Sequence, residues 1–246
     1  GVNEVVVCTP DPSLSTLAAA QLTGVDRLFQ IGGVQAIAAM AFGTDTVPKV
    51  DKIFGAGNIF VALAKRAVYG AVDIDGLYGP TETIIVADDT ANPKLCAADL
   101  LAQAEHDEMA SPIFLTTSRD IAQRVIDELN RQVAEMQRRK IAAASIANNG
   151  IIVVVNDVEE AIALANAYAP EHLCLMIDEP WNSIDKVSNA GGIFLGENSP
   201  EVMGDYIAGP SHVMPTGGTA RFNSSLGIAQ FIRRTPVVSL NQSTVD

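Results

Sequence analysis

The stretch Thr83-Ile84-Ile85-Val86-Ala87 is a short, uncharged run rich in β-branched residues, and it decides the fold class. After a polar turn, Asn92-Pro93 opens a segment rich in Ala and Leu that predicts a helix to about His106. The next apolar run, from Ile113 to Thr117, predicts a second strand. Strands and helices that alternate at this spacing are typical of a parallel sheet covered by helices on both faces.

The same alternation extends in both directions along the chain. Toward the C-terminus it predicts a long helix from about 118, a strand at 151–155, a helix at 157–168, a strand at 173–177 and a helix at about 180–189. Toward the N-terminus it predicts strands at 4–8, 27–31 and 52–54, with helices at 13–22, 34–41 and 58–69. The region 191–225 is rich in Gly, Pro, Ser and Asn, and it predicts a long functional loop.

These elements predict an α/β protein of two Rossmann-like, doubly wound parallel-sheet units. We place a first Rossmann-like unit at 1–79, a second, incomplete one at 80–225, and a C-terminal segment at 226–246. The chain has no initiator Met and enters a strand-like segment at once, so we expect it to be a piece of a longer protein.

The composition excludes several classes of protein. The chain has 246 residues, 48% of them hydrophobic, and 16 basic against 29 acidic residues give a net charge of −13. This composition excludes intrinsic disorder and disfavours a nucleic-acid partner, because nucleic-acid affinity depends on Lys and Arg. No apolar run is long enough to suggest a membrane span. Cys8, Cys96 and Cys174 lie far apart without a CxxC pair, which favours a reducing compartment such as the cytoplasm.

Two glycine-rich turns follow predicted strands and precede predicted helices. They are Gly32-Gly33 and Gly55-Ala56-Gly57-Asn58. Both fall at the carboxyl ends of parallel strands, where open α/β sheets bind ligands and where helix N-termini attract phosphate. Neither matches the GxGxxG fingerprint. From the residues alone, each turn is either a dinucleotide-binding loop or an ordinary strand-to-helix turn.

Two of the three histidines have polar neighbours that suggest chemistry. Gln103 and His106 share a face of the predicted helix, so they present an oxygen and an imidazole nitrogen to one ion. The alternative is a hydrogen bond at the helix end. His172 follows Glu171 between a helix and a strand, where a carboxylate and an imidazole serve as acid and base. The alternative there is a solvated turn.

The third histidine, His212, lies in the long polar loop that also contains Asp205. Asp205 offers a hard oxygen ligand, and the neighbouring glycines let the backbone approach a small molecule closely. The alternative is a surface hairpin. A thiolate is also a nucleophile for aldehyde oxidation, but Cys174 lies in an apolar strand, so we expect a buried, inert thiol. Cys8 and Cys96 are expected to be packing residues.

Seven motifs follow one another along the chain. They are Gly33-Val34-Gln35-Ala36-Ile37-Ala38, Lys52-Ile53-Phe54-Gly55-Ala56-Gly57-Asn58, Gly79-Pro80-Thr81-Glu82, Gln103-Ala104-Glu105-His106-Asp107, Ala169-Pro170-Glu171-His172-Leu173, Gly204-Asp205-Tyr206, and the segment from His212 to Phe222. In order and spacing this set resembles histidinol dehydrogenase, and the resemblance covers essentially all 246 residues.

The resemblance implies an oxidoreductase of histidine biosynthesis. Its members oxidise L-histidinol through the aldehyde to L-histidine with two NAD molecules and one zinc ion per site. By motif, Gln103, His106 and Asp205 are expected to be zinc ligands. A fourth ligand, a His, and a substrate-contacting Glu are expected in a C-terminal tail beyond Asp246, which the two subunits of a homodimer exchange.

The resemblance makes 1–79 the expected NAD-binding domain, 80–225 the expected zinc- and substrate-binding domain, and 226–246 the expected start of the exchanged tail. It also implies roles for the remaining motifs. Gln35 and Asn58 are expected to contact NAD, together with a Tyr that precedes Gly1. Glu171 and His172 are expected to be the catalytic acid/base pair: His172 takes the hydroxyl proton, and Glu171 activates the water that hydrates the aldehyde. Zinc is expected to hold the imidazole and amine of the substrate. The expected substrate contacts are Thr81, Gln103, His106, His172, Asp205 and His212.

The chain departs from the family pattern at two positions. Ala56 replaces the Pro of the Gly-Pro-Gly-Asn turn, and Glu108 stands where Pro often follows His-Asp. Neither position touches the expected chemistry. Two alternatives stay open at this point: a sister zinc/NAD dehydrogenase of another small amino or sulfonated alcohol, and a non-catalytic metal- or nucleotide-binding fragment.

Overall fold

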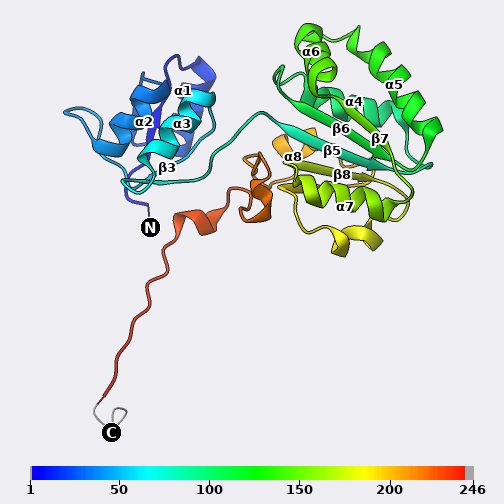
Figure 1. Ribbon diagram of the computed structural model, residues 1–246. Helices are drawn as coiled ribbons and strands as arrows, with labels where there is room; N and C mark the ends of the chain where they lie inside the picture. Colours follow the sequence, from blue (N-terminus) through cyan, green and yellow to red (C-terminus); the bar gives the residue numbers. More distant parts are fainter. Residues whose placement is uncertain (1, 242–246) are drawn as a thin grey trace. The chain divides into compact units, whose positions relative to one another are not determined.

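The computed structural model describes residues 2–241 of the chain (Figure 1). Internal contacts divide the chain into two units. One holds the residues up to Ile31 and those from Gly227 onward, and the other runs from Gly32 to Leu226. This division differs from the predicted ranges 1–79, 80–225 and 226–246, which stay a prediction. Residues 1 and 242–246 of those ranges lie outside the described residues.

The first unit contains a parallel strand pair joined by one helix. Strand β1 (Val6–Cys8) pairs with β2 (Arg27–Phe29), and α1 (Leu14–Thr23) connects them. Helix α1 begins where the Ser13 hydroxyl accepts a hydrogen bond from the Thr16 amide, and it ends at Gly24 in the left-handed conformation. A short 3₁₀ turn, η3 (Ile228–Phe231), belongs to the same unit.

The second unit begins with a small layer of two helices over a strand pair. Strand β3 (Lys52–Ile53) pairs in parallel with β4 (Asp73–Ile74), and the helices are α2 (Gly33–Phe42) and α3 (Ile59–Val68). Ile37, Ile53 and Val68 are buried together and hold the layer. The four short strands of the first 79 residues therefore form two separate parallel pairs, and not the single sheet that we predicted.

A five-stranded parallel sheet forms the larger part of the second unit, in the order β7-β6-β5-β8-β9. Its strands are β5 (Glu82–Ala87), β6 (Ser111–Thr116), β7 (Ile151–Val154), β8 (His172–Met176) and β9 (Gly192–Leu195). Chain order and sheet order reverse between β5 and β8, which makes this a doubly wound α/β sheet. The predicted fold class is confirmed for this sheet.

Helices cover both faces of the five-stranded sheet, as Figure 1 shows. On one face, α4 (Pro93–Ala104) and α5 (Arg119–Val133) pack against alternate strand residues such as Ile85 and Phe114. On the other face, α7 (Val158–Tyr168) packs against the residues between them, such as Ile84 and Leu173. The central strands consist mainly of apolar residues because both faces are buried.

The predicted helix starts at Asn92 and Asp157 are confirmed. The Asn92 side chain accepts a hydrogen bond from the Lys94 amide at 3.0 Å, with Pro93 as the first helical residue. The Asp157 carboxylate accepts one from the Glu160 amide at 2.8 Å. Each side chain pairs one of the amide groups that a helix leaves without a partner at its N-terminus.

Three local predictions are wrong. The single long helix predicted from about 118 is broken into α5 and α6 (Arg139–Asn149), and α6 folds back against α4. The predicted helix at 180–189 is a 3₁₀ helix, η1 (Pro180–Lys186). The region 191–225 is not only a loop, because it supplies the edge strand β9 and the short helix α8 (Glu201–Tyr206).

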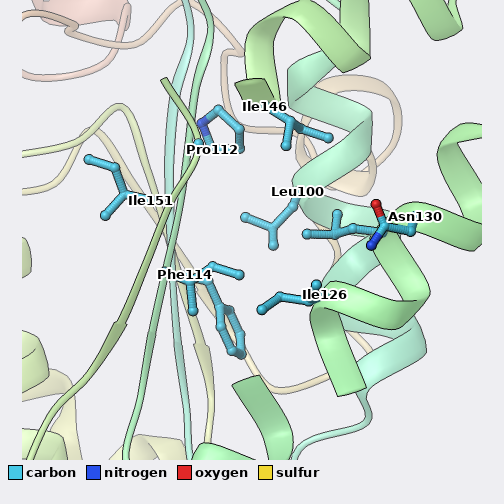
Figure 2. Close-up of a pocket in the computed structure, with 10 residues that line it drawn as sticks. Leu100, Pro112, Phe114, Ile126, Asn130, Ile146 and Ile151 are labelled. Carbon is cyan, nitrogen blue, oxygen red and sulfur yellow. The ribbon is translucent and has the colours of Figure 1, made fainter. Parts of the chain in front are cut away.

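An apolar cavity of about 140 Å³ lies between the helices α4 to α6 and the strands β6 and β7 (Figure 2). Leu100, Phe114, Ile126 and Ile151 are among the side chains that line it, and none of the predicted site residues does. Within residues 2–241, no helix is long and apolar enough to cross a membrane.

Candidate active site

The candidate site lies where strands β5 and β8 begin. Thr81 directly precedes β5, and Glu171 directly precedes β8, which His172 opens. Thr83 and His172 are register partners in the two neighbouring strands. This pairing brings together two motifs that are 90 residues apart in the chain.

Thr81 connects three of the predicted residues. Its hydroxyl oxygen lies 2.8 Å from Oε2 of Glu171 and 2.9 Å from Oε1 of Gln103. A hydroxyl has one proton, so it donates to one of these two acceptors at a time. Gln103 lies in the last turn of α4, and its side chain is buried. The sequence motifs around Thr81, Gln103 and Glu171 therefore meet at one point of the structure.

His172 is held in one tautomer. Its Nδ1 lies 3.3 Å from the backbone carbonyl oxygen of Glu82, which only accepts hydrogen bonds, so Nδ1 carries the proton. Nε2 then has a lone pair, and among the described residues this buried atom has no hydrogen-bond partner. Burial lowers the pKa of His172 to about 4. The imidazole is therefore neutral at pH 7 and can accept a proton at Nε2.

Glu171 is a buried carboxyl group beside this imidazole. Its Oε2 lies 3.7 Å from Nδ1 of His172 and accepts a hydrogen bond from the Glu82 amide at 3.3 Å. Burial raises the pKa of Glu171 to about 7, although the hydrogen bonds from Thr81 and Glu82 oppose the shift. A carboxyl group with this pKa exchanges protons readily near neutral pH.

His106 and Asp205 approach the same site from two other elements. Burial is the largest cause of the lowered pKa of His172, the hydrogen bond to Glu82 and the charge of Asp205 oppose it, and the charge of His106 adds to it. The charge of Asp205 also raises the pKa of Glu171. His106 follows α4, and its Nδ1 donates to the Ala102 carbonyl at 2.8 Å, which leaves Nε2 as a ligand atom. Asp205 lies on α8 and is half-buried.

The donor set suits a zinc ion. The predicted ligands are the imidazole nitrogen of His106, the carboxylate of Asp205 and the side-chain amide of Gln103, and nitrogen and oxygen ligands of these types bind zinc. Their convergence on one ion stays a prediction. Two buried nitrogens, Nε2 of Gln103 and Nε2 of His172, have no hydrogen-bond partner among residues 2–241. Buried polar atoms of this kind usually have partners, so they indicate that the site receives a polar ligand.

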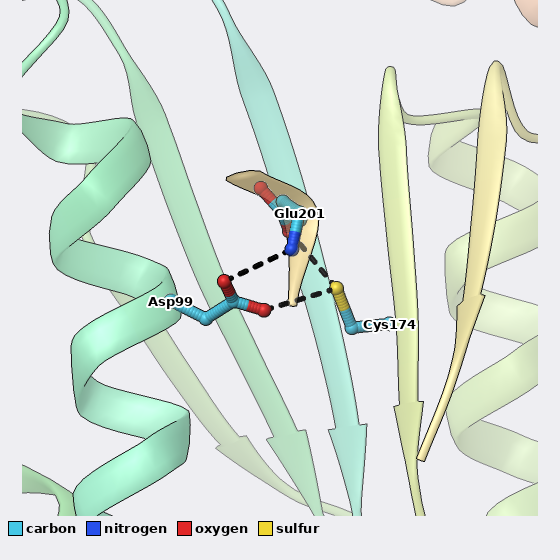
Figure 3. A group of neighbouring side chains, drawn as sticks. All are labelled: Asp99, Cys174 and Glu201. Carbon is cyan, nitrogen blue, oxygen red and sulfur yellow. Dashed lines mark hydrogen bonds between the residues drawn. The ribbon is translucent and has the colours of Figure 1, made fainter. Parts of the chain in front are cut away.

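A second group of buried side chains lies behind His172, and sequence reasoning missed two of its members. Cys174 lies 3.0 Å from Oε1 of Glu201 and 3.6 Å from Oδ2 of Asp99, and the Glu201 amide donates to Asp99 at 3.2 Å (Figure 3). Glu201 also accepts from the Thr83 hydroxyl. Glu201 precedes Asp205 by four residues, and Asp99 precedes Gln103 by four. Residues four apart share one face of a helix, so this spacing is the sequence signal that could have identified Asp99 and Glu201.

The ligand atoms of Asp99, Cys174 and Glu201 lie within 4.8 Å of one another, as a metal site requires. However, burial raises the pKa of Asp99 to about 6, that of Glu201 to about 8, and that of the Cys174 thiol well above its ordinary value. Hydrogen bonds from Cys174 to Glu201 and Asp99, and from the Glu201 amide to Asp99, hold the group together. We therefore interpret the group as a hydrogen-bonded support for the site. The predicted burial of Cys174 is confirmed.

The predicted NAD contacts lie at the beginnings of α2 and α3. Gln35 is exposed in the first turn of α2, and Asn58 caps α3, where its Oδ1 accepts from the amides of Phe60 and Val61 at 3.1 Å each. Helix N-termini are favourable positions for phosphate groups. The predicted contacts of Gln35 and Asn58 with NAD stay a prediction.

His212 is exposed in the loop after α8. No hydrogen bond or ion pair joins it to the residues above within the described part of the chain. Its predicted contact with substrate stays a prediction.

Comparison with known proteins decides the family. The chain matches the family model of histidinol dehydrogenase over residues 1–246. It is 55% identical to the histidinol dehydrogenase of Thermus thermophilus over 244 residues, which cover 98% of the chain and 59% of that relative. The chain belongs to the histidinol dehydrogenase family. The histidinol dehydrogenase of Dehalococcoides mccartyi strain CBDB1 is 52% identical over all of the chain and 57% of its own length.

A solved structure agrees with the histidinol dehydrogenase assignment. The crystal structure of histidinol dehydrogenase from Elizabethkingia anophelis has a TM-score of 0.91 and 41% identity, over 95% of this chain and 55% of that one. The chain thus spans somewhat more than half the length of the histidinol dehydrogenases that it matches.

Proposed function

We propose that the protein is a zinc- and NAD-dependent dehydrogenase that oxidises L-histidinol through L-histidinaldehyde to L-histidine. The observation that carries the proposal is the meeting of Thr81, Glu171 and His172 beside Gln103, in a chain of the histidinol dehydrogenase family. Bound zinc would hold the imidazole and amine of the substrate, with Gln103, His106 and Asp205 as its ligands.

His172 is the proposed base of the first oxidation. When hydride leaves the carbinol carbon for NAD, the hydroxyl group must lose its proton. The neutral imidazole presents the Nε2 lone pair, because Nδ1 is held by the Glu82 carbonyl. A base within hydrogen-bond reach of the hydroxyl removes the proton without a free hydroxide ion.

Glu171 is the proposed base of the second oxidation. The aldehyde must gain water before a second hydride can leave, and a carboxylate beside the reacting carbon takes a proton from that water. The pKa of Glu171, about 7, makes it a stronger base than an ordinary Glu. Thr81 orients the carboxyl group through Oε2. One pocket for both steps also protects the reactive aldehyde from solvent.

NADH formation tests this proposal. The native polypeptide that carries this sequence should form NADH with L-histidinol, and a zinc chelator should stop the reaction. Activity on another amino or sulfonated alcohol but not on L-histidinol would favour a sister dehydrogenase. Binding of zinc or NAD without any oxidation would favour a non-catalytic binding protein.

The glutamate role has a separate test. Glu171→Gln should slow oxidation of the aldehyde more than oxidation of the alcohol, because only the second step needs an activated water. Each half-reaction is measured by supplying L-histidinol or L-histidinaldehyde. Equal slowing of both half-reactions would remove the proposed role.

The resemblance supports two further parts of the proposal. The complete protein is proposed to be a homodimer in which an exchanged C-terminal tail supplies a His to zinc and a Glu to the substrate. Light scattering and a tail deletion test this, since the deletion should reduce zinc content and activity together. A cytoplasmic location is also proposed, and cell fractionation tests it.

A further inference from the structure

A buried ion pair lies under the glycine-rich loop that precedes α3. The ammonium group of Lys65, on α3, contacts the carboxylate of Asp75, which directly follows β4. Only 1% of the Lys65 side chain and none of the Asp75 side chain is exposed. A Lys and an Asp are almost never buried this completely without a specific arrangement around them.

The pair binds both polar groups of the Gly55 backbone. Nζ of Lys65 donates to the Gly55 carbonyl at 2.7 Å, and Oδ2 of Asp75 accepts from the Gly55 amide at 2.7 Å. Oδ1 of Asp75 also accepts from the Gly76 amide at 2.8 Å. Gly55 has a φ of +125°, a conformation that side-chain-bearing residues rarely adopt. Both polar groups of this residue are thus tied to buried charges.

Tyr78 packs beside the ion pair, and Gly57 packs the other end of the loop against α3. The Tyr78 ring lies 5.0 Å from Nζ of Lys65. Burial, followed by the charge of Asp75 and a hydrogen bond to it, raises the pKa of Tyr78 to about 12. At the other end of the loop, a Cβ on Gly57 would lie 2.8 Å from Cβ of Val61, so the loop lies tightly on the first turn of α3. The loop is therefore held at Gly55 and at Gly57, immediately before Asn58.

We propose that Lys65 and Asp75 are positioning residues for NAD: their ion pair holds the loop from Gly55 to Asn58 in the conformation that receives the dinucleotide. This inference rests on the proposed NAD dependence. A loop that is already ordered loses less conformational entropy on binding. The affinity for NAD therefore depends on the Lys65–Asp75 ion pair, here called the clamp, although neither side chain touches NAD. Lys65 is not a phosphate ligand in this arrangement, because its charge is buried and paired with Asp75.

The test uses Asp75→Asn, Lys65→Met and the double variant in the native polypeptide that carries this sequence. The matched control is Asp73→Asn, because Asp73 pairs with Lys52 across the same two strands, 2.8 Å apart but partly exposed. NAD affinity is measured by calorimetric titration, and amide hydrogen exchange is followed at Gly55 and Gly76. The KM for NAD is compared with the KM for L-histidinol.

Asp75→Asn should weaken NAD binding about tenfold or more and raise the KM for NAD, with the KM for L-histidinol unchanged. Exchange at Gly55 should accelerate in the same variant, and Asp73→Asn should leave both readouts within about twofold. If Lys65 were a phosphate ligand, Asp75→Asn would free its charge and tighten NAD binding, which would overturn the proposal.

The double variant distinguishes a loss of loop positioning from a general loss of folding. It buries no unpaired charge and should melt closer to the parent than either single variant, yet it should bind NAD as weakly as Asp75→Asn. Normal NAD affinity in the double variant, together with fast exchange at Gly55, would refute the positioning role. A parent protein that binds no NAD would instead refute the proposed function, and this inference with it.

Discussion

Two regions of the protein bury charged groups in different ways. Under the loop before α3, Lys65 and Asp75 pair with each other in full burial. Where β5 and β8 begin, the buried carboxyl groups of Glu171 and Glu201 lie near the neutral His172, and no Lys or Arg pairs with them within residues 2–241. A paired charge stays ionised and holds structure, whereas an unpaired buried carboxyl group takes up a proton.

The comparison explains why one region is a clamp and the other is suited to proton transfer. Four donors surround the Asp75 carboxylate: the Lys65 ammonium, the amides of Gly55 and Gly76, and the Tyr78 hydroxyl. Burial is the largest cause of the raised pKa values of Glu171 and Glu201, to about 7 and about 8. Such groups can gain and lose protons near neutral pH, which a clamp must not do.

The largest expected effect comes from breaking the clamp. Lys65→Met leaves the Asp75 carboxylate buried without its cation, and this should lower the free energy of unfolding by about 3–5 kcal/mol. Urea unfolding measures the loss. Lys65→Met combined with Asp75→Asn should lose less than Lys65→Met alone, and a double variant that loses the sum of the two single effects would contradict a direct pairing.

A smaller effect should appear in the pH dependence of the metal-free protein. The pKa values of Glu171 and Glu201 are raised in the folded state, so the stabilisation that they contribute is complete below about pH 4.5 and is lost as the pH rises through about 7 and 8. His172, whose pKa is lowered, acts in the opposite direction between about pH 4 and 6.5. Stability should therefore fall between about pH 6.5 and 8.

The decline in stability should amount to a few kcal/mol at most, because each pKa unit corresponds to about 1.4 kcal/mol. Thermal unfolding of the metal-free protein across this pH range measures it. Glu201→Gln should reduce the decline, since the variant has no proton to lose at this position. An unchanged pH profile in that variant would show that Glu201 is already ionised in the folded protein.

The next prediction concerns Thr81, whose hydroxyl donates a hydrogen bond to Oε2 of Glu171. Thr81→Val keeps the shape of the side chain but removes the donor that stabilises the Glu171 carboxylate. The pKa of Glu171 should rise further, and the acidic limb of the pH–rate profile for aldehyde oxidation should move to higher pH. A hydrogen bond to a charged group contributes about 1.5–3 kcal/mol, which sets the upper limit of the shift. If the acidic limb does not move, it reflects the titration of a group other than Glu171.

The smallest effect should come from the exposed counterpart of the clamp. Asp73→Asn removes the ion pair with Lys52 across the same strands, but the side chains are 51% and 23% exposed. Surface pairs contribute about 0–1 kcal/mol, so the variant should unfold in urea almost as the parent does. A loss as large as that of Lys65→Met would show that burial is not what separates the two pairs.

Four of the five strands of the main sheet could be predicted because each carries its own signal. Thr83 to Ala87 and Ile113 to Thr116 are uncharged and mainly apolar, as is typical of strands buried on both faces. The edge strand β9 and the helix α8 were missed, because their glycines and prolines resemble a loop when read alone. β9 is stabilised by pairing with β8, and that contact is invisible in a local pattern.

The sequence by itself determined the alternation of strands and helices, the caps at Asn92 and Asp157, and the residue types of the proposed acid/base pair at Glu171 and His172. Only the tertiary structure decided which protons these residues hold, because pKa values depend on burial and on neighbours that are distant in the chain. It alone also revealed that Lys65 and Asp75 meet, since the two residues are ten positions apart in the chain and no short motif connects them.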